Sequence, residues 1–110
     1  MGEKSIFLDH VGYSPRMKIL EYLIEGRDFD CTLTDMLNAR VSWGTLNSLI
    51  PKFEKLKLIV RTRKIGRATL YKINQNHVFV KQLIALYDKL ILDKLKQIEA
   101  KNKKLKVLAR

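Results

Sequence analysis

The apolar residues of this 110-residue chain change their spacing twice, and this order of periods constrains the fold more than any other feature. Up to Leu58 they recur three or four residues apart, as on the buried face of a helix. In "IVRTRKIGRATLYKIN", residues 59–74, they alternate in two runs around a Gly, which is the pattern of a β-hairpin. From about His77 the helical spacing returns, and Asn74 or Asn76 is the expected cap of this last helix. The sequence therefore predicts a mainly α-helical chain with a small β-hairpin (α+β) and one long helix at the end.

The segment before the hairpin predicts three helices with recognisable ends. In "YSPRMKILEYLIEG", Ser14 is a natural N-cap, Pro15 suits the first helical position and Gly26 suits the end. In "TLTDMLNAR", Thr32 and Asp35 have the spacing of a variant capping box. A further short helix is expected earlier, in "SIFLDHV". These segments carry apolar stripes that belong to one core.

The helix directly before the hairpin, the third with recognisable ends, opens with the only Trp of the chain. Ser42 is its expected N-cap and Trp43 its first residue. Its apolar positions recur three or four residues apart and are Leu46, Leu49, Ile50, Phe53 and Leu56, of which the first four are taken to face the core. Pro51 removes one backbone hydrogen bond and predicts a kink or a loosened turn.

The charge of the chain is strongly positive and unevenly placed. The net charge is +11. Residues 1–50 carry five Lys/Arg against seven Asp/Glu, a net of −2, and residues 51–110 carry seventeen against four, a net of +13. A basic half joined to a nearly neutral half is what binding to a polyanion such as DNA requires.

Two short helices joined by a tight turn and followed by a hairpin form a winged helix-turn-helix. The stretch "TLTDMLNARVSWGTLNSLIPKFEKLKLIVRTRKIGRATLYKIN" resembles the DNA-binding core of small prokaryotic transcription regulators of the ArsR/MarR/PadR type, and the resemblance covers roughly residues 14–80. Its most specific pieces are "SWGTL", "FEKLKLI" and "GRATLYKIN". The resemblance implies a winged helix-turn-helix that binds double-stranded DNA. The cysteine-rich metal motif of ArsR-type sensors is absent, which argues against metal sensing.

The third helix is the expected recognition helix. Such a helix enters the major groove, about 12 Å wide, with its solvent-facing side. Asn47 can bond adenine, while hydroxyls and free N–H groups at the helix N-terminus favour phosphate. Trp43 is expected either to touch DNA or to pack against the turn or the wing, and Gly44 to allow close approach. The expected DNA contacts of this helix are Ser42, Trp43, Gly44, Thr45, Asn47, Ser48 and Lys52.

The first half of the hairpin concentrates positive charge. Arg61, Arg63, Lys64 and Arg67 lie within seven residues that contain no acid. Each phosphate that such a side chain neutralises releases counterions and adds salt-dependent affinity. We therefore expect these four side chains to contact DNA, with Arg67 at the tip of the wing entering a minor groove.

The C-terminal helix predicts dimerisation. A helix of about 30 residues is about 45 Å long, more than a head of this size can cover. Its apolar stripe therefore needs a partner, and a second copy of the chain is the simplest one. Apolar residues repeat every seven positions along two rows of this helix, one through Ile84, Ile91, Ile98 and Leu105 and the second through Tyr87. Lys94 and Lys101 lie in the second row, which indicates that pairing loosens towards the end. The expected dimerisation residues are Val80, Ile84, Tyr87, Ile91, Leu95, Ile98 and Leu105.

These predictions divide the chain into a winged helix-turn-helix domain, residues 1–76, and a dimerisation helix with a basic tail, residues 77–110. Two distant histidines and the lone Cys31 form no recognisable site, so we expect no enzyme, no catalytic or metal-binding residues and no cofactor. No apolar run approaches the ~18 residues of a membrane span, so a cytoplasmic chain without a membrane partner is expected. Any small effector would bind at the dimer cleft, near Tyr87 and Phe79.

The most direct functional interpretation is a homodimeric, sequence-specific transcription regulator, with repression by promoter occlusion as the simplest mechanism. Two alternatives stay open. One is an architectural or segregation-type DNA-binding protein with little sequence preference. The other is a winged helix that contacts another protein instead of DNA.

Overall fold

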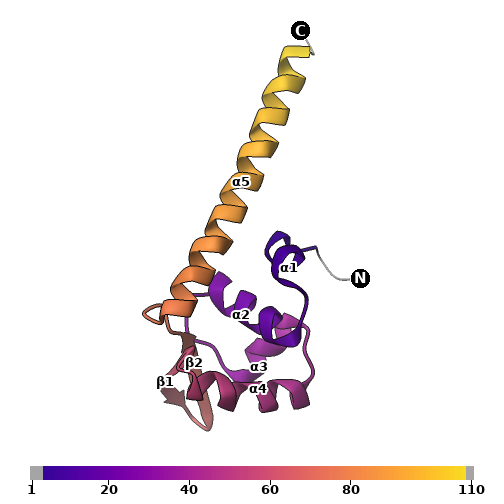
Figure 1. Ribbon diagram of the computed structural model, residues 1–110. Helices are drawn as coiled ribbons and strands as arrows, with labels where there is room; N and C mark the ends of the chain where they lie inside the picture. The colour runs from indigo at the N-terminus through magenta and orange to yellow at the C-terminus, as the bar shows by residue number, and fades with distance from the viewer. Residues whose placement is uncertain (1–3, 109–110) are drawn as a thin grey trace.

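The structure, a computed structural model, describes residues 4–108 and consists of a helical head, a hairpin and one long helix (Figure 1). Its elements are α1 (Ile6–Val11), α2 (Pro15–Glu25), α3 (Leu33–Met36), the 3-10 helix η1 (Leu37–Ala39), α4 (Trp43–Lys55), β1 (Ile59–Ile65), β2 (Ala68–Ile73) and α5 (Val78–Leu108). The predicted class, mainly α with a small hairpin, is confirmed. Residues 1–3 of the expected first domain and residues 109–110 of the expected basic tail lie outside the described residues.

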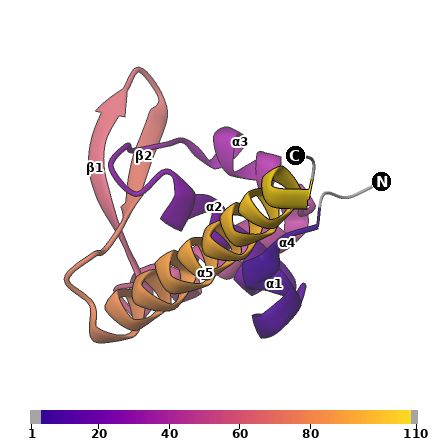
Figure 2. The same ribbon diagram turned by 90° about the horizontal axis from the view of Figure 1, so that it is seen from above.

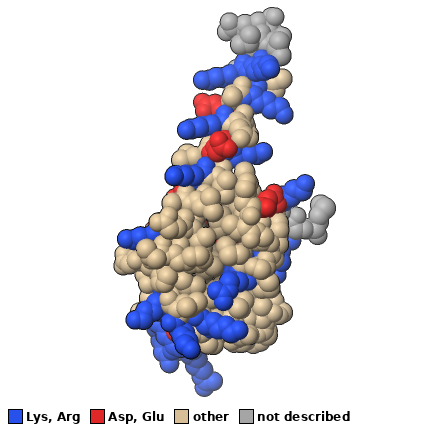
Figure 3. Space-filling view, in the orientation of Figure 1, with Lys and Arg blue, Asp and Glu red and all other residues tan. Residues whose placement is uncertain are grey.

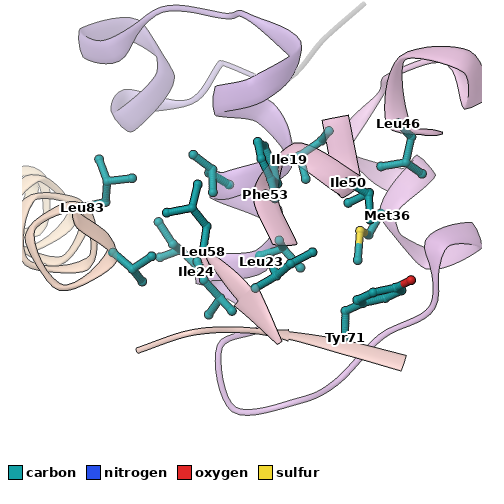
Figure 4. Close-up of a cluster of buried hydrophobic side chains, with 14 of the residues drawn as sticks. Ile19, Leu23, Ile24, Met36, Leu46, Ile50, Phe53, Leu58, Tyr71 and Leu83 are labelled. Atoms are coloured by element: carbon teal, nitrogen blue, oxygen red, sulfur yellow. The ribbon is translucent and has the colours of Figure 1, made fainter. Parts of the chain in front are cut away.

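The head has one apolar core, in which α1, α2 and α4 meet the hairpin (Figure 4). The predicted stripe of α2 is buried; it comprises Ile19, Leu20, Leu23 and Ile24. Helix α4 runs without interruption through Pro51 and buries Leu46, Ile50 and Phe53. Leu56, the last of the apolar positions at helical spacing, lies outside the core. Its side chain is 52% exposed because α4 ends at Lys55 and the chain turns away there.

The turn between α3 and α4 orients α4. Both bonds of the predicted capping box are present, since Thr32 Oγ1 accepts the Asp35 N–H at 3.1 Å and Asp35 Oδ2 accepts the Thr32 N–H at 3.0 Å. Helix α3 then tightens into η1, which ends at Arg40 in the left-handed conformation, with φ of 65°. The reversal places Ser42 as predicted at the N-cap of α4.

The hairpin is antiparallel and contains a bulge. Val60 pairs with Lys72 and Arg61 with Tyr71, but the next pair is Arg63 with Leu70, which leaves Thr62 as the extra residue. On its other edge, β2 forms an isolated bridge between Tyr71 and Cys31. The segment around Cys31 adds this single bridge to the hairpin. Together, the bridge and the bulge fix the base of the wing against the head.

Helix α5 begins at Val78 and is capped differently from the prediction. Asn74 and Asn76 were the expected caps, but His77 Nδ1 accepts the Phe79 N–H at 3.0 Å. Asn74 cannot also cap the helix, because its amide closes the preceding turn with bonds to the Asn76 N–H at 3.1 Å and the Lys57 carbonyl at 2.9 Å. The expectation of an Asn cap is therefore wrong.

The first turns of α5 pack into the head, and the rest of the helix projects from it (Figures 1 and 2). Val80 and Leu83 are buried, and the Tyr87 ring meets the Phe7 ring of α1 edge-on at 5.5 Å between centroids. Beyond Ile91 the helix has left the head, and its large apolar side chains there are exposed: Leu92, Leu95, Ile98 and Leu105.

An ion pair joins the turn after α2 to α5. Arg27 donates from Nη2 to Asp88 Oδ1 at 2.7 Å and from Nη1 to Asp88 Oδ2 at 3.0 Å. Arg27 is itself held, because its Nε donates to the Ile24 carbonyl at 2.9 Å and its own carbonyl accepts from Gln75 at 3.1 Å. The pair lowers the pKa of Asp88. This fork fixes the base of α5 to the head.

Lys57, just after α4, adopts a left-handed conformation with φ of 63°. A residue with a Cβ pays for that conformation in strain, whereas Gly adopts it freely. Lys57→Gly is therefore expected to raise the free energy of unfolding by about 0.5–1 kcal/mol, after the larger entropy of the unfolded Gly chain is subtracted. Thermal melts measure the change. Lys52→Gly, inside α4, is the control and should lower stability by about 1 kcal/mol. Equal effects of both substitutions would contradict the interpretation.

Candidate nucleic-acid interface

Helix α4 presents a polar face to solvent. The side chains opposite its buried stripe are exposed as predicted; they are Trp43, Gly44, Asn47, Ser48 and Lys52. Ser42 is exposed and Thr45 half-buried, and they close the first turn, with Ser42 Oγ accepting the Thr45 N–H at 3.1 Å and donating to Thr45 Oγ1 at 2.8 Å. Asn47 donates to the Trp43 carbonyl at 3.0 Å, so a bidentate contact with adenine requires its amide to turn outward.

Trp43 and Gly44 open this helix without serving the core. Trp43 is 50% exposed, so it does not provide the buried packing for which Trp is usually used. A Cβ placed on Gly44 would meet nothing within 4 Å, so no contact within the chain requires Gly at this position. Both residues are therefore available to an outside partner.

Gly44→Ala separates the needs of the fold from those of a partner. Because the added methyl group lies in open space and Ala is the better helix former, the free energy of unfolding should stay unchanged or rise by up to about 1 kcal/mol. If DNA approaches this backbone closely, the same methyl group should lower DNA affinity by about tenfold, as the loss of one good contact does. Melting curves and fluorescence anisotropy measure the two quantities. Unchanged affinity would show that the DNA does not come close to Gly44.

Arg16 extends this face, and sequence reasoning did not single it out. A hollow of about 410 Å³ lies between the N-terminal ends of α2 and α4, lined by Ser14, Pro15, Arg16, Gly44, Thr45, Ser48 and Leu49. The guanidinium carbon of Arg16 sits 5.4 Å from the centroid of the Phe53 ring, which holds the side chain beside α4. Arg16 belongs to the nearly neutral half of the sequence, where counting charges did not indicate DNA binding. Its position after "SP" at a helix start was the available clue.

The four cations of the wing differ in their surroundings. Lys and Arg side chains gather at the lower end of the head, where Figure 1 places the hairpin and α4 (Figure 3). Lys64 and Arg67 are exposed, and no ion pair to either is present among the described residues. Arg61 instead donates from Nε to Glu54 at 2.8 Å, and Arg63 donates from Nε to Asp30 at 2.9 Å. The wing segment from Arg61 to Arg67 contains no acidic residue, but the fold brings Glu54 and Asp30 to its arginines.

The remaining described groups offer little chemistry. Burial raises the pKa of the Cys31 thiol to about 11, with Asp35 and Asp30 adding to the shift, so the thiol stays protonated. Within residues 4–108 no group of three or more His, Cys, Asp or Glu side chains is arranged to hold a metal ion. None of the described helices is long and apolar enough to cross a membrane.

The expected dimerisation residues fall into two groups. Val80 is fully buried in the head of its own chain, so its assignment to a dimer surface is wrong. The periodicity of α5 continues through the head and beyond it, which is why sequence alone did not separate the two parts. Ile84, Tyr87 and Ile91 are half-buried against the same chain, whereas Leu95, Ile98 and Leu105 are 56%, 45% and 55% exposed.

Comparison with known proteins rests on structure. No family model matches this sequence, and no curated protein matches it. Among solved structures, NadR in complex with 4-hydroxyphenylacetate is 19% identical, with a TM-score of 0.62, and the match covers 93% of this chain and 72% of that one. MepR, a transcription regulator of the Staphylococcus aureus multidrug efflux pump MepA, is 18% identical, with a TM-score of 0.57 and coverage of 91% and 77%.

A third neighbour has been solved on nucleic acid. Lactococcus lactis ZitR in complex with DNA is 14% identical, with a TM-score of 0.56, and the match covers 84% of this chain and 66% of that one. At these identities the likeness concerns the fold. The chain therefore has a winged helix-turn-helix fold with a long C-terminal helix, the fold of solved transcription regulators.

Proposed function

We propose that this chain is a transcription regulator that binds double-stranded DNA with sequence preference. The observation that carries the proposal is the shared position of the exposed polar face of α4 and the basic wing at one end of the head. In this proposal α4 lies in the major groove and the wing contacts the adjacent minor groove and phosphates. Arg16 and the first turn of α4 contact the backbone.

The second part of the proposal is a homodimer formed through the projecting part of α5. In the monomer, an apolar stripe of Leu95, Ile98 and Leu105 is left in water, at the opposite end of the molecule from the wing. Pairing with a second copy covers this stripe. The half-buried Ile84, Tyr87 and Ile91 would then flank the contact where α5 leaves the head. Two heads held this way would address two half-sites, and occlusion of a promoter is the simplest regulatory outcome.

A cavity beside the base of α5 is the place for a small effector, if the regulator responds to one. It measures about 540 Å³ and lies between α1, α2, η1 and α5, with Tyr13, Tyr22 and Tyr87 in its wall. Phe79, which was expected to lie near the effector together with Tyr87, does not line this cavity. A ligand here would contact both the head and the helix that we assign to dimerisation, so its binding would be coupled to the angle between them.

Selection of bound duplexes from a random pool tests the proposal. We expect enrichment of a pseudo-palindromic motif whose half-sites lie one or more helical turns apart. Binding without enrichment would support the architectural alternative, in which affinity depends on salt but hardly on sequence. Binding no better than that of an unrelated basic protein at moderate salt would contradict both DNA-binding hypotheses, the regulator and the architectural protein. It would favour a winged helix that contacts another protein. Sedimentation of the free protein tests the dimer separately.

A further inference from the structure

The bulge in β1 turns two consecutive wing residues towards one carboxylate. Asp30, in the loop after α2, accepts a hydrogen bond from Thr62 Oγ1 at 2.6 Å. It also accepts two from Arg63, from Nε at 2.9 Å and from Nη2 at 3.2 Å. In a regular strand neighbouring side chains point to opposite faces, so the extra residue at Thr62 is what allows both to reach Asp30.

This contact uses the part of Arg63 that would bind a phosphate. The Nε and Nη2 groups form the fork with which Arg binds carboxylates and phosphates in bidentate fashion. The Asp30 side chain is only 17% exposed, whereas that of Arg63 is 60% exposed. Arg63 lowers the pKa of Asp30 to about 2, with Thr62 contributing, so this carboxylate stays charged wherever DNA binding is measured.

The other wing cations show that this pairing is selective. Lys64 and Arg67 lie one and four residues after Arg63, are exposed and have no ion-pair partner among the described residues. Arg61 is paired with Glu54 of α4, on the recognition-helix side, and its guanidinium also lies 5.8 Å from the centroid of the Tyr71 ring. The sequence cluster of four cations is thus divided by the fold into a free pair at the tip and a paired set at the base.

We propose that Asp30 withholds Arg63 from DNA and thereby sets the affinity of the wing below what its charge would allow. A guanidinium neutralised by a carboxylate releases no counterion from a phosphate, so it adds little to salt-dependent binding. To engage Arg63, DNA must displace Asp30 from the same donor groups. Asp30 acts on DNA binding only through Arg63, whose donor groups it holds. The inference rests on the proposed DNA-binding function.

Asp30→Asn tests the proposal. The amide keeps an oxygen for Thr62 but loses the charge that holds Arg63. For each protomer bound, we expect DNA affinity at moderate salt to rise by about three- to tenfold and the slope of log affinity against log salt to steepen by about 0.9. Arg63→Ala alone should change the slope little. Anisotropy titrations of the full chain on one fixed duplex, from low to moderate salt, measure both quantities.

Asp28→Asn is the matched control, because it makes the same charge change two residues away and no described bond joins Asp28 to Arg63. The gain from Asp30→Asn must exceed that of the control and must vanish when Arg63→Ala is also present. An equal gain in the control, or a loss of affinity in Asp30→Asn with normal melting, would overturn the proposal. Loss would mean that Asp30 aims Arg63 at DNA. If the wild-type chain binds no duplex, the proposed function fails instead.

Discussion

Replacement of Leu95 and Ile98 by Glu together is expected to convert the proposed dimer into a monomer and to lower affinity for a DNA with two half-sites by about 100-fold or more. Both side chains are exposed in the single chain, so their loss leaves the head intact. Placing two charges on each of two facing helices opposes pairing through repulsion and through loss of apolar contact. A monomer then binds each half-site alone and forfeits the effective concentration that linkage provides.

The opposite face of α5 offers a control with the same charge change. Gln97→Glu with Ala100→Glu also adds two negative charges, at positions that the helical period places away from the Leu95 stripe. This variant should stay dimeric and keep most of its DNA affinity. Sedimentation equilibrium and anisotropy distinguish the two. A wild-type chain that sediments as a monomer at high concentration, or a Leu95/Ile98 variant that stays dimeric, would contradict the assignment of α5.

Replacement of Lys64 and Arg67 by Ala is expected to have the second large effect, mainly on the salt dependence of binding. These are the wing cations without an ion-pair partner among the described residues, so each is available to a phosphate. A dimer would lose four such contacts, and the slope of log affinity against log salt should fall by about 3.6. The stability of the fold should hardly change, because both side chains are exposed.

Lys96→Ala with Lys103→Ala removes the same charge from the projecting part of α5. Since these lysines lie away from the wing, the slope should fall far less than in the Lys64/Arg67 variant. Titration at four or five salt concentrations on one duplex gives both slopes. Equal losses in the two variants would show that the chain senses DNA through its overall charge, as the architectural alternative requires.

Local sequence patterns were sufficient for the ends of most helices. Ser14, Ser42 and the Thr32–Asp35 box cap helices as predicted, because a capping residue and the N–H groups it satisfies lie within three residues of each other. The hairpin was equally predictable, since period-two alternation around Gly66 is read within a few positions. The division between buried and exposed sides of α4 followed from helical spacing, apart from Leu56.

The contacts that shape the candidate interface could not be predicted in this way. Asp30 and Arg63 are 33 residues apart, and the bulge that brings them together has no marker in the sequence. Counting charges along the chain therefore predicted four free wing cations, where the fold leaves two of them paired. Helix capping by His77 was missed for a related reason, because Asn74 is a better cap by type but is already engaged by the turn.

The fork between Arg27 and Asp88 has a mechanical consequence. It holds α5 near the base, and about 20 further residues, some 30 Å of helix, extend beyond Asp88. A tilt of about 5° at this joint would move the far end of the helix by roughly 2.6 Å, since displacement grows with the length of the arm. If two chains are joined along the projecting parts of α5, the far ends are held, and the same tilt at the joint would instead move the heads. The paired ends of α5 would then be the fixed point of the dimer. The Arg27–Asp88 joint in each chain would limit how far apart the two heads can move.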